Sequence, residues 1–251
     1  MDSIQAHVHS GVLTLRLERP EKFNALTNAM YDSLADRLFD TNRDDDVRAV
    51  LITGGDTCFT SGNDLRDFLE SPPRDLDAPA FRFMRAVIEL EKPLIAAVCG
   101  AAIGIGTTLL PHCDLVYITR GSKLSMPFVR LGLCQEFGAS LVMPGILGAT
   151  RAARLLLCGD SFSGQQAADW GLATEAFDSA EQCLAAAREQ AHRLAQQPAG
   201  ALRDSKRLLR APQLEALRHT IREENQTFIA RLQSEEARNA LHAMVNKTTA
   251  R

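Results

Sequence analysis

The sequence predicts an α/β core followed by an α-helical C-terminal extension, and two observations support this fold class. Short apolar runs of the kind that form buried strands alternate with helical patterns as far as about Thr174. Beyond Ala180 every predicted element is a helix, over residues 180–196, 199–210, 214–232 and 235–245. Alternating units followed by helices are typical of an α/β domain with an appended helical region. We therefore expect a core at residues 1–195 and a helical region at residues 196–251.

The bulk composition limits the class of protein. The chain has 251 residues, of which 45% are hydrophobic, enough for one large domain with an appendage. Its formal net charge of −3 creates no basic field that would attract nucleic acid. The first residues lack the basic and apolar regions of a secretory signal. The longest apolar stretch, residues 94–110, contains glycine and threonine and is short for a membrane span. These features predict a soluble cytoplasmic protein.

Within the core, turn residues and apolar patterns place the elements in order. Residues 4–9 and 12–18 alternate apolar and polar side chains around Ser10-Gly11, which predicts a β-hairpin. Apolar runs predict further strands at residues 47–53, 94–98, 115–119 and 123–125. Periodicity or a capping residue predicts helices from Thr27 or Asn28 to about Asp40, from Asp64, over residues 81–90 and near residues 107–111.

Several motifs with a chemical meaning are incomplete or absent. The segment Gly104-Ile-Gly106-Thr-Thr-Leu109 follows a predicted strand, but Leu109 replaces the last glycine of a dinucleotide fingerprint and the expected acidic residue is missing. No P-loop, nucleophile elbow or His-Glu-x-x-His motif occurs, and no cysteine pair has C-x-x-C spacing. His112-Cys113-Asp114 lies between a helix end and an apolar strand, which favours a packed turn. The sequence therefore predicts neither a metal site nor a nicotinamide cofactor.

Two glycine-containing loops, residues 59–65 and 100–106, precede predicted helices. Each offers free backbone N–H groups at a helix N-terminus, where the helix dipole favours negative charge. Two converging N–H donors can form an oxyanion hole for a thioester oxygen that becomes an enolate oxygen. Either loop alone is also compatible with an ordinary strand-to-helix turn.

Together the loops belong to an ordered series of motifs that resembles the enoyl-CoA hydratase/isomerase (crotonase) superfamily. The matching segments are Arg19-Pro-Glu-Lys-Phe-Asn-Ala-Leu26, Val50-Leu-Ile-Thr-Gly54, Phe59-Thr-Ser-Gly-Asn-Asp-Leu65, Lys92-Pro-Leu-Ile-Ala-Ala-Val98, residues 100–106, Cys113-Asp-Leu-Val116, Gly164-Gln-Gln-Ala-Ala-Asp-Trp-Gly-Leu172 and the helical tail. The resemblance implies a spiral of repeated ββα units and an acyl-CoA thioester ligand, with no cofactor besides the CoA of the substrate. It also implies a homotrimer or a dimer of trimers, assembled through the C-terminal helices.

Carried over position by position, the resemblance assigns roles to individual residues. The oxyanion N–H groups would come from the backbone of Asn63 and Ile105. The residues expected along the CoA and acyl path are Lys22, Ala25, Leu26, Ser61, Asp64, Leu65, Gly104, Phe128 and Leu131. For Lys22, a solvated loop lysine is as compatible with the sequence as a contact with a CoA phosphate.

The carboxylates of the superfamily distinguish its reactions, because the fold alone does not. A hydratase keeps one glutamate two residues after the second glycine loop and another after a proline in the next loop. Thr108 and Phe128 occupy those two places here. A carboxylate appears later, at Glu136, where the peroxisomal-type Δ3,Δ2-enoyl-CoA isomerases carry their single catalytic glutamate. The resemblance therefore implies a Δ3,Δ2-enoyl-CoA isomerase of fatty acid β-oxidation, with Glu136 as the base.

Two alternatives stay open from the sequence. Another crotonase activity on an acyl-CoA, such as hydration or thioester hydrolysis, would use the same fold and oxyanion hole. A non-catalytic acyl-CoA-binding protein would account for the loss of both hydratase glutamates, although Glu136 argues against it.

Overall fold

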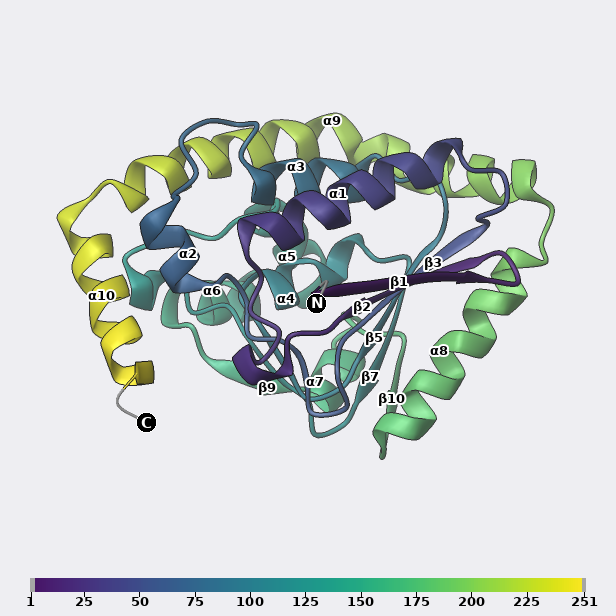
Figure 1. The fold of residues 1–251 in the computed structure, drawn as a ribbon, viewed down its shortest axis with the longest axis horizontal. Helices are drawn as coiled ribbons and strands as arrows, with labels where there is room; N and C mark the ends of the chain where they lie inside the picture. The colour runs from purple at the N-terminus through teal and green to yellow at the C-terminus, as the bar shows by residue number, and fades with distance from the viewer. Residues whose placement is uncertain (1–2, 250–251) are drawn as a thin grey trace.

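The chain folds around two β-sheets in a computed structural model that describes residues 3–249 (Figure 1). The strands are β1 (Ile4–His9), β2 (Val12–Leu17), β3 (Ala49–Thr53), β4 (Cys58–Thr60), β5 (Leu94–Val98), β6 (Ala101–Ile103), β7 (Leu115–Thr119), β8 (Lys123–Ser125), β9 (Ser161–Ser163) and β10 (Glu175–Phe177). The larger sheet has the order β1-β2-β3-β5-β7-β10, and the smaller has the order β4-β6-β8-β9.

Helices surround the two sheets and form the whole C-terminal region (Figure 1). They are α1 (Asn28–Arg43), α2 (Leu65–Glu70), α3 (Pro79–Ile88), α4 (Ile105–Thr108), α5 (Ala139–Leu147), α6 (Ala149–Cys158), α7 (Gly164–Asp169), α8 (Ala180–Ala195), α9 (Ala199–Leu232) and α10 (Glu235–Thr249), with 3-10 turns η1 (Pro20–Lys22), η2 (Leu110–His112) and η3 (Val129–Leu131). The Thr27 hydroxyl caps α1 and the Asp64 carboxylate caps α2, which confirms both predicted starts.

The predicted hairpin and spiral are both present. β1 and β2 pair antiparallel around Ser10 and Gly11, whose φ angles of 47° and 77° suit a tight hairpin turn. After the hairpin, successive strand pairs divide between the sheets: β3, β5 and β7 join the larger sheet, whereas β4, β6 and β8 join the smaller one. Neighbours within each series are parallel. This repetition confirms the crotonase-like arrangement of ββα units.

The central strands are buried on both faces because helices cover each side of the larger sheet. In β3, Val50 and Ile52 pack in the main core with α1 and α3, whereas Ala49 and Leu51 pack in a second core against α8. Figure 1 shows α1 and α3 on one side of these strands and α8 on the other. The side chains on both faces of these strands must therefore be apolar, which explains the continuous apolar runs in the sequence.

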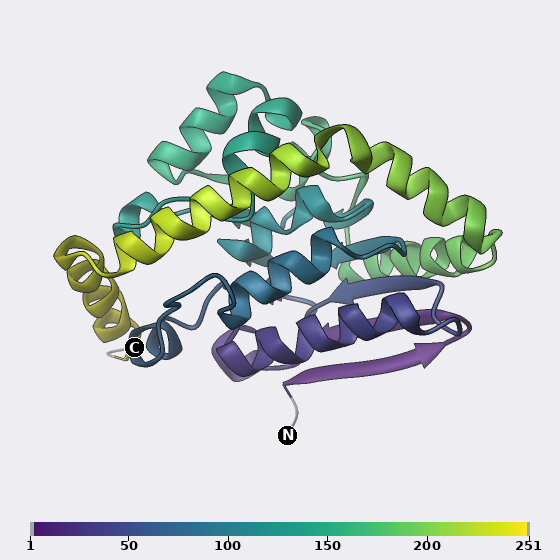
Figure 2. The ribbon, with the colours of Figure 1, turned by 90° about the horizontal axis from the view of Figure 1, so that it is seen from above.

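The C-terminal region differs from the prediction at one point. Residues 199–210 and 214–232 were expected as separate helices, but α9 runs unbroken through Pro212. A proline ring removes one N–H and crowds the preceding turn, which bends a helix without always ending it. Figure 2 shows α9, green turning to yellow, as one helix that bends partway along its length. Pro212 leaves the carbonyl of Leu208 without its helical partner, and Leu208 is 61% exposed, so water can hydrate that carbonyl.

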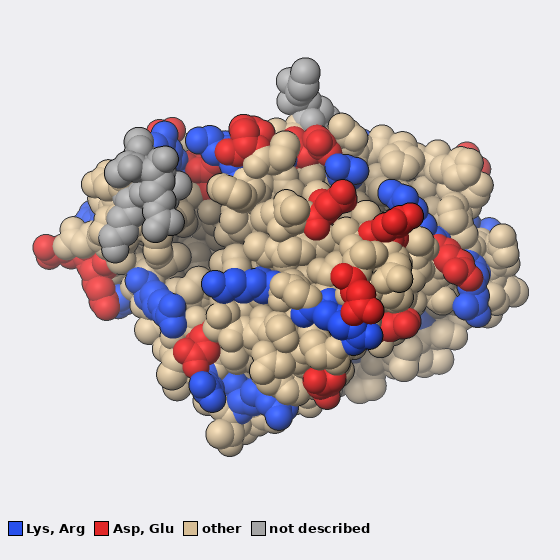
Figure 3. All heavy atoms as spheres, turned by 90° about the horizontal axis from the view of Figure 1, so that it is seen from below, with Lys and Arg blue, Asp and Glu red and all other residues tan. Residues whose placement is uncertain are grey.

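The surface carries both signs of charge. On the face drawn in Figure 3, Lys and Arg side chains alternate with Asp and Glu side chains among uncharged residues, and no single-sign field covers that face. Within residues 3–249, no helix combines the length and hydropathy that a membrane crossing requires.

Candidate active site

The two glycine loops predicted to form an oxyanion hole lie against each other. A Cβ atom at Gly62 would stand 2.9 Å from the Ile103 carbonyl oxygen, and one at Gly106 would stand 2.6 Å from the Thr60 methyl carbon. Gly62 has a φ of 93°, so its conformation also favours glycine. Parallel pairing of β4 with β6 brings the loops to the same edge of the smaller sheet. The glycines are therefore required by close approach as well as by turn geometry.

The backbone N–H groups of Asn63 and Ile105 have no hydrogen-bond acceptor within the described residues. On either side of Asn63, the Leu26 N–H donates to the Gly62 carbonyl and the Asp64 N–H donates to the Leu26 carbonyl, both at 2.8 Å. The Asn63 N–H itself donates to no acceptor within residues 3–249. Ile105 is the first residue of α4, and its N–H is equally unused in the described chain. These are the two donors that the resemblance implied.

Glu136 is a fully buried carboxyl group without a partner. Its exposed fraction is 0%, and neither carboxyl oxygen has a hydrogen bond within the described residues. Burial, with a smaller effect from the charge of Glu224, raises the pKa of Glu136 to about 8. An unpaired buried carboxyl group is costly to retain, and such groups are concentrated at functional sites.

Tyr31 on α1 joins the neighbourhood of Glu136 to the first glycine loop. Its hydroxyl donates a hydrogen bond to the side-chain oxygen of Asn63. Burial raises the pKa of Tyr31, and the Glu136 and Asp67 carboxyl groups raise it further, so the phenol is neutral and remains a donor. The Tyr31 ring packs 5.6 Å from the Phe83 ring, which packs 6.4 Å from the Phe137 ring. Tyr31 therefore links the surroundings of Glu136 to the first glycine loop.

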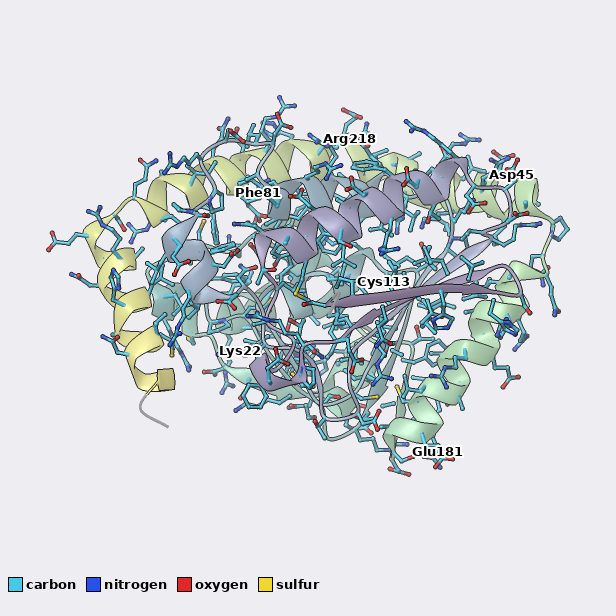
Figure 4. All side chains as sticks on the ribbon, in the orientation of Figure 1. Lys22, Asp45, Phe81, Cys113, Glu181 and Arg218 are labelled. Atoms are coloured by element: carbon cyan, nitrogen blue, oxygen red, sulfur yellow. The ribbon has the colours of Figure 1, made fainter. Side chains whose placement is uncertain are left out.

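The loop of residues 22–26 packs against the first glycine loop, as expected for two parts of one binding surface. The Ser61 N–H donates to the Phe23 carbonyl at 3.0 Å, and the Thr60 hydroxyl donates to the Asn24 carbonyl at 2.7 Å. Within this loop Ala25 is half-buried and Leu26 is buried. The exposed Lys22 extends from η1 at the outer surface (Figure 4).

The Asp64 carboxylate is already engaged within the protein. It accepts a hydrogen bond from Arg19 at 2.6 Å and from the N–H groups of Arg66 and Asp67 at the start of α2. Burial alone would raise the pKa of Asp64. The hydrogen bonds and the Arg19 charge together outweigh that effect, so the pKa of Asp64 is lowered. Its side chain therefore orders the loop that carries Asn63.

The remaining predicted residues fall into two groups. Gly104 and Phe128 are adjacent, because a Cβ atom at Gly104 would lie 3.9 Å from the Phe128 ring. Leu65 begins α2 and Leu131 ends η3, and both are half-buried against the main core. A Cβ atom at Gly62 would lie 3.9 Å from the Gly104 Cα, so the segments that carry Asn63 and Ile105 adjoin each other.

Sequence reasoning did not identify three side chains near Glu136. Tyr31 and Glu224 were not singled out, and His112 was interpreted as part of a packed turn. His112 is indeed buried, but its ring nitrogen lies 2.7 Å from the Phe137 carbonyl oxygen, directly after Glu136. One signal could have revealed Glu224: it interrupts the apolar stripe of α9 between Ile221 and Phe228.

A groove of about 620 Å³ lies elsewhere, between α9 and the ends of α1 and α3. None of its lining residues belongs to the glycine loops or to the Glu136 segment. Its lining includes Arg203, Arg207 and Arg218, but no unpaired buried acid–base group. The cluster around Glu136 is therefore the better candidate for chemistry. Among residues 3–249 no group of three His, Cys, Asp or Glu side chains is placed to hold a metal ion.

Comparison with known proteins agrees with the fold. Residues 7–251 match the family described as enoyl-CoA hydratase/isomerase. The 1,2-epoxyphenylacetyl-CoA isomerase of Escherichia coli is 38% identical over 205 residues, covering 79% of this chain and 78% of that protein. Human enoyl-CoA delta isomerase 2 is 34% identical over 239 residues, covering 92% of this chain but 60% of that protein. The structure of Pseudomonas aeruginosa OdaA matches with a TM-score of 0.95 and 52% identity, covering 97% of this chain and 99% of that one. The chain belongs to the enoyl-CoA hydratase/isomerase (crotonase) superfamily of acyl-CoA enzymes.

Proposed function

We propose that this enzyme converts 3-enoyl-CoA into trans-2-enoyl-CoA with one carboxylate as the proton carrier. The observation that carries the proposal is Glu136, a buried carboxyl group without a partner in the described residues, which Tyr31 links to the loop that carries the unused Asn63 N–H. A proton shuttle needs a desolvated base whose carboxyl oxygens are not engaged by the protein, and the burial of Glu136 and its lack of a hydrogen-bond partner within the described residues support that role.

The chemistry follows from the substrate. In a 3-enoyl thioester the C2 protons are acidic, because the resulting enolate is conjugated with the double bond. The Glu136 carboxylate removes a C2 proton, and negative charge develops on the thioester oxygen. The N–H groups of Asn63 and Ile105 stabilise that oxygen. The protonated Glu136 then returns the proton at C4, and the double bond moves into conjugation with the thioester. The oxyanion hole supplies the electronic stabilisation, so the mechanism requires no metal or redox cofactor.

The CoA portion of the substrate is assigned to the surface that precedes the oxyanion loop. We propose that Ala25, Leu26, Ser61, Asp64 and Leu65 line its path, with Asp64 acting through the loop conformation that it holds. Lys22 is exposed on the adjoining turn and is the side chain proposed to meet a phosphate. Phe128, Leu131 and Gly104 are proposed to border the acyl chain.

Isomerisation is favoured over hydration because the positions where hydratases keep glutamates hold Thr108 and Phe128. Both are buried, with exposed fractions of 0% and 4%. The names of the two relatives described above also indicate isomerases of CoA thioesters, although their substrates differ.

The direct test is incubation of the purified enzyme with 3-hexenoyl-CoA. We expect absorbance from the conjugated 2-enoyl thioester to appear with turnover. A protein that binds the thioester without producing this absorbance would exclude the isomerase function and support a binding protein. Release of free CoA instead would support a thioesterase.

We further propose that the enzyme is a trimer or a dimer of trimers and acts in the cytoplasm. Ile221, Phe228 and Leu232 of α9 are buried in the subunit's own core, but Leu209 on the same helix is 84% exposed and Leu157 on α6 is 67% exposed. Exposed leucines of this kind suit symmetric subunit contacts. Light scattering at micromolar concentration is expected to give a mass of three or six chains, and a monomeric mass would contradict the assembly.

A further inference from the structure

The segment that follows Glu136 is held from α9 by a second buried carboxylate, Glu224. Its oxygens accept hydrogen bonds from the Gly138 N–H at 2.5 Å, the Ser140 N–H at 2.8 Å and the Ser140 hydroxyl at 2.6 Å. Gly138 is the N-cap residue of α5 and has no side chain to cap that helix. Glu224, 86 residues away along the chain, thus supplies the cap.

On its other side the same segment is held by His112. Burial lowers the pKa of His112 to about 4, although its bond to the Phe137 carbonyl opposes that shift, so the ring is neutral and its Nε2–H donates to that carbonyl. The imidazole also stacks on the Phe137 ring at 4.2 Å. Phe137 and Gly138 have φ angles of 65° and 72°. A left-handed phenylalanine is strained, so this turn needs contacts from outside itself.

The charges around Glu136 single out Glu224. Tyr31 from α1 and His112 from η2 are held neutral, and burial raises the pKa of the nearby Cys134 thiol to about 11, which leaves it neutral as well. Arg231, in the last turn of α9, donates a hydrogen bond to the Gly132 carbonyl and forms an ion pair with Glu236. Glu224 is therefore the group near Glu136 whose oxygens face three donors. Burial raises the pKa of Glu224, and the hydrogen bonds from Ser140 and Gly138 oppose that shift by favouring the carboxylate.

We propose that Glu224 is a positioning residue for Glu136. Its carboxylate fixes the turn at residues 137–140 that presents Glu136, and its negative charge sets the electrostatic environment in which Glu136 exchanges a proton. This inference rests on the proposed role of Glu136 as the base. It assigns to α9 a part in the active site of its own subunit, in addition to its packing role.

The decisive variant is Glu224→Gln. Both oxygens of the Glu224 carboxylate accept hydrogen bonds, but a glutamine side chain has only one acceptor oxygen. Its NH2 group must therefore face at least one of the donors at Gly138 or Ser140. We expect kcat with 3-hexenoyl-CoA to fall by about ten- to a hundredfold, the effect of a modest misplacement of the base, while KM changes little. Because a negative charge is lost, the midpoint of the pH–kcat/KM profile is expected to move to lower pH.

Two further variants separate geometry from charge. Ser140→Ala removes one hydrogen bond but keeps the Glu224 charge, so it is expected to lower kcat without moving the pH midpoint. Glu223→Gln changes the neighbouring, exposed glutamate of α9 and is expected to leave both unchanged. Wild-type kcat together with an unmoved midpoint in Glu224→Gln would overturn the proposal.

An activity-independent titration distinguishes this inference from the isomerase proposal. The infrared carbonyl band of a protonated Glu136, identified by its absence in Glu136→Gln, can be followed with pH in the full-length protein. We expect Glu224→Gln to lower the midpoint of that band even if 3-hexenoyl-CoA is not turned over. A shift without turnover would refute the isomerase function alone, whereas wild-type turnover without a shift would refute the role of Glu224. If Glu224→Gln does not fold, Glu224→Asp is measured in the same way, and a wild-type kcat and midpoint there would also count against the proposal.

Discussion

Glu136→Gln is expected to lower kcat on 3-hexenoyl-CoA by ~10²–10⁴, the usual cost of removing a general base. Glutamine preserves the shape of the side chain but cannot take up a proton. Thioester affinity is expected to stay similar, because the substitution leaves the proposed oxyanion donors, the N–H groups of Asn63 and Ile105, and the proposed CoA surface untouched. Turnover is measured from the absorbance of the conjugated product, and affinity from binding of a saturated acyl-CoA. Near wild-type turnover in Glu136→Gln would remove this residue from the mechanism.

A stability measurement on Glu136→Gln distinguishes loss of the base from loss of the folded state. The pKa of Glu136 is raised from 4.5 to about 8 in the folded chain. Between these values the folded state holds a proton that the unfolded state releases, so the stability contributed by the protonated carboxyl group falls as pH rises through this window. Glutamine has no such cost. The variant is therefore expected to melt at a higher temperature than the wild type above about pH 8, with Glu223→Gln as the control that melts like the wild type.

The same pKa sets the pH dependence of the wild-type enzyme. The base must be ionised before it can accept the C2 proton. Because burial disfavours the ionised form, kcat/KM is expected to rise with pH through about 8 rather than through the range of an exposed glutamate. This raised pKa also suits the proposed reaction, in which Glu136 returns the same proton at C4.

Much of the architecture could be predicted because its signals are local. The apolar runs at β5 and β7 were recognisable as buried strands, since α8 and the main core cover opposite faces of the sheet. The caps at Thr27 and Asp64 lie within three residues of the groups they satisfy. The continuous helix through Pro212 was not predicted, because the effect of a proline depends on whether its surroundings tolerate a bend.

In the candidate site, too, the features with local sequence signals could be predicted and those that depend on tertiary contacts could not. Glycine loops can be recognised in the sequence because positive φ angles and close backbone approach require glycine, as at Gly62. Glu136 was reached through a family resemblance, since a single glutamate in a loop has no distinctive pattern. Tyr31 and Glu224 act across 32 and 86 residues of sequence, onto Asn63 and Gly138. Contacts of that range depend on tertiary packing, and only the charged interruption of the α9 stripe pointed toward one of them.

The largest difference between reactions is expected in the comparison of isomerisation with hydration. We predict that kcat/KM for 3-hexenoyl-CoA exceeds that for hydration of crotonyl-CoA by at least ~10³, roughly the effect of one positioned acid–base group. The two substrates are assayed in parallel on one enzyme preparation. Glu136→Gln serves as the control in both assays, because any rate that survives in it comes from another source.

The physical reason lies in the two positions that lack carboxylates. Hydration needs a water molecule held and activated by two groups on one side of the double bond. The Thr108 hydroxyl is buried and unpartnered within the described chain. An aliphatic hydroxyl stays protonated at neutral pH, so it cannot replace a carboxylate as the base. Phe128, also buried, excludes water from its surroundings. Glu136 alone can carry a proton between C2 and C4, yet it cannot also fix a water molecule for attack. Comparable rates on the two thioesters would show that another residue positions that water, and the assignment of Thr108 and Phe128 as the determinants of reaction choice would be wrong.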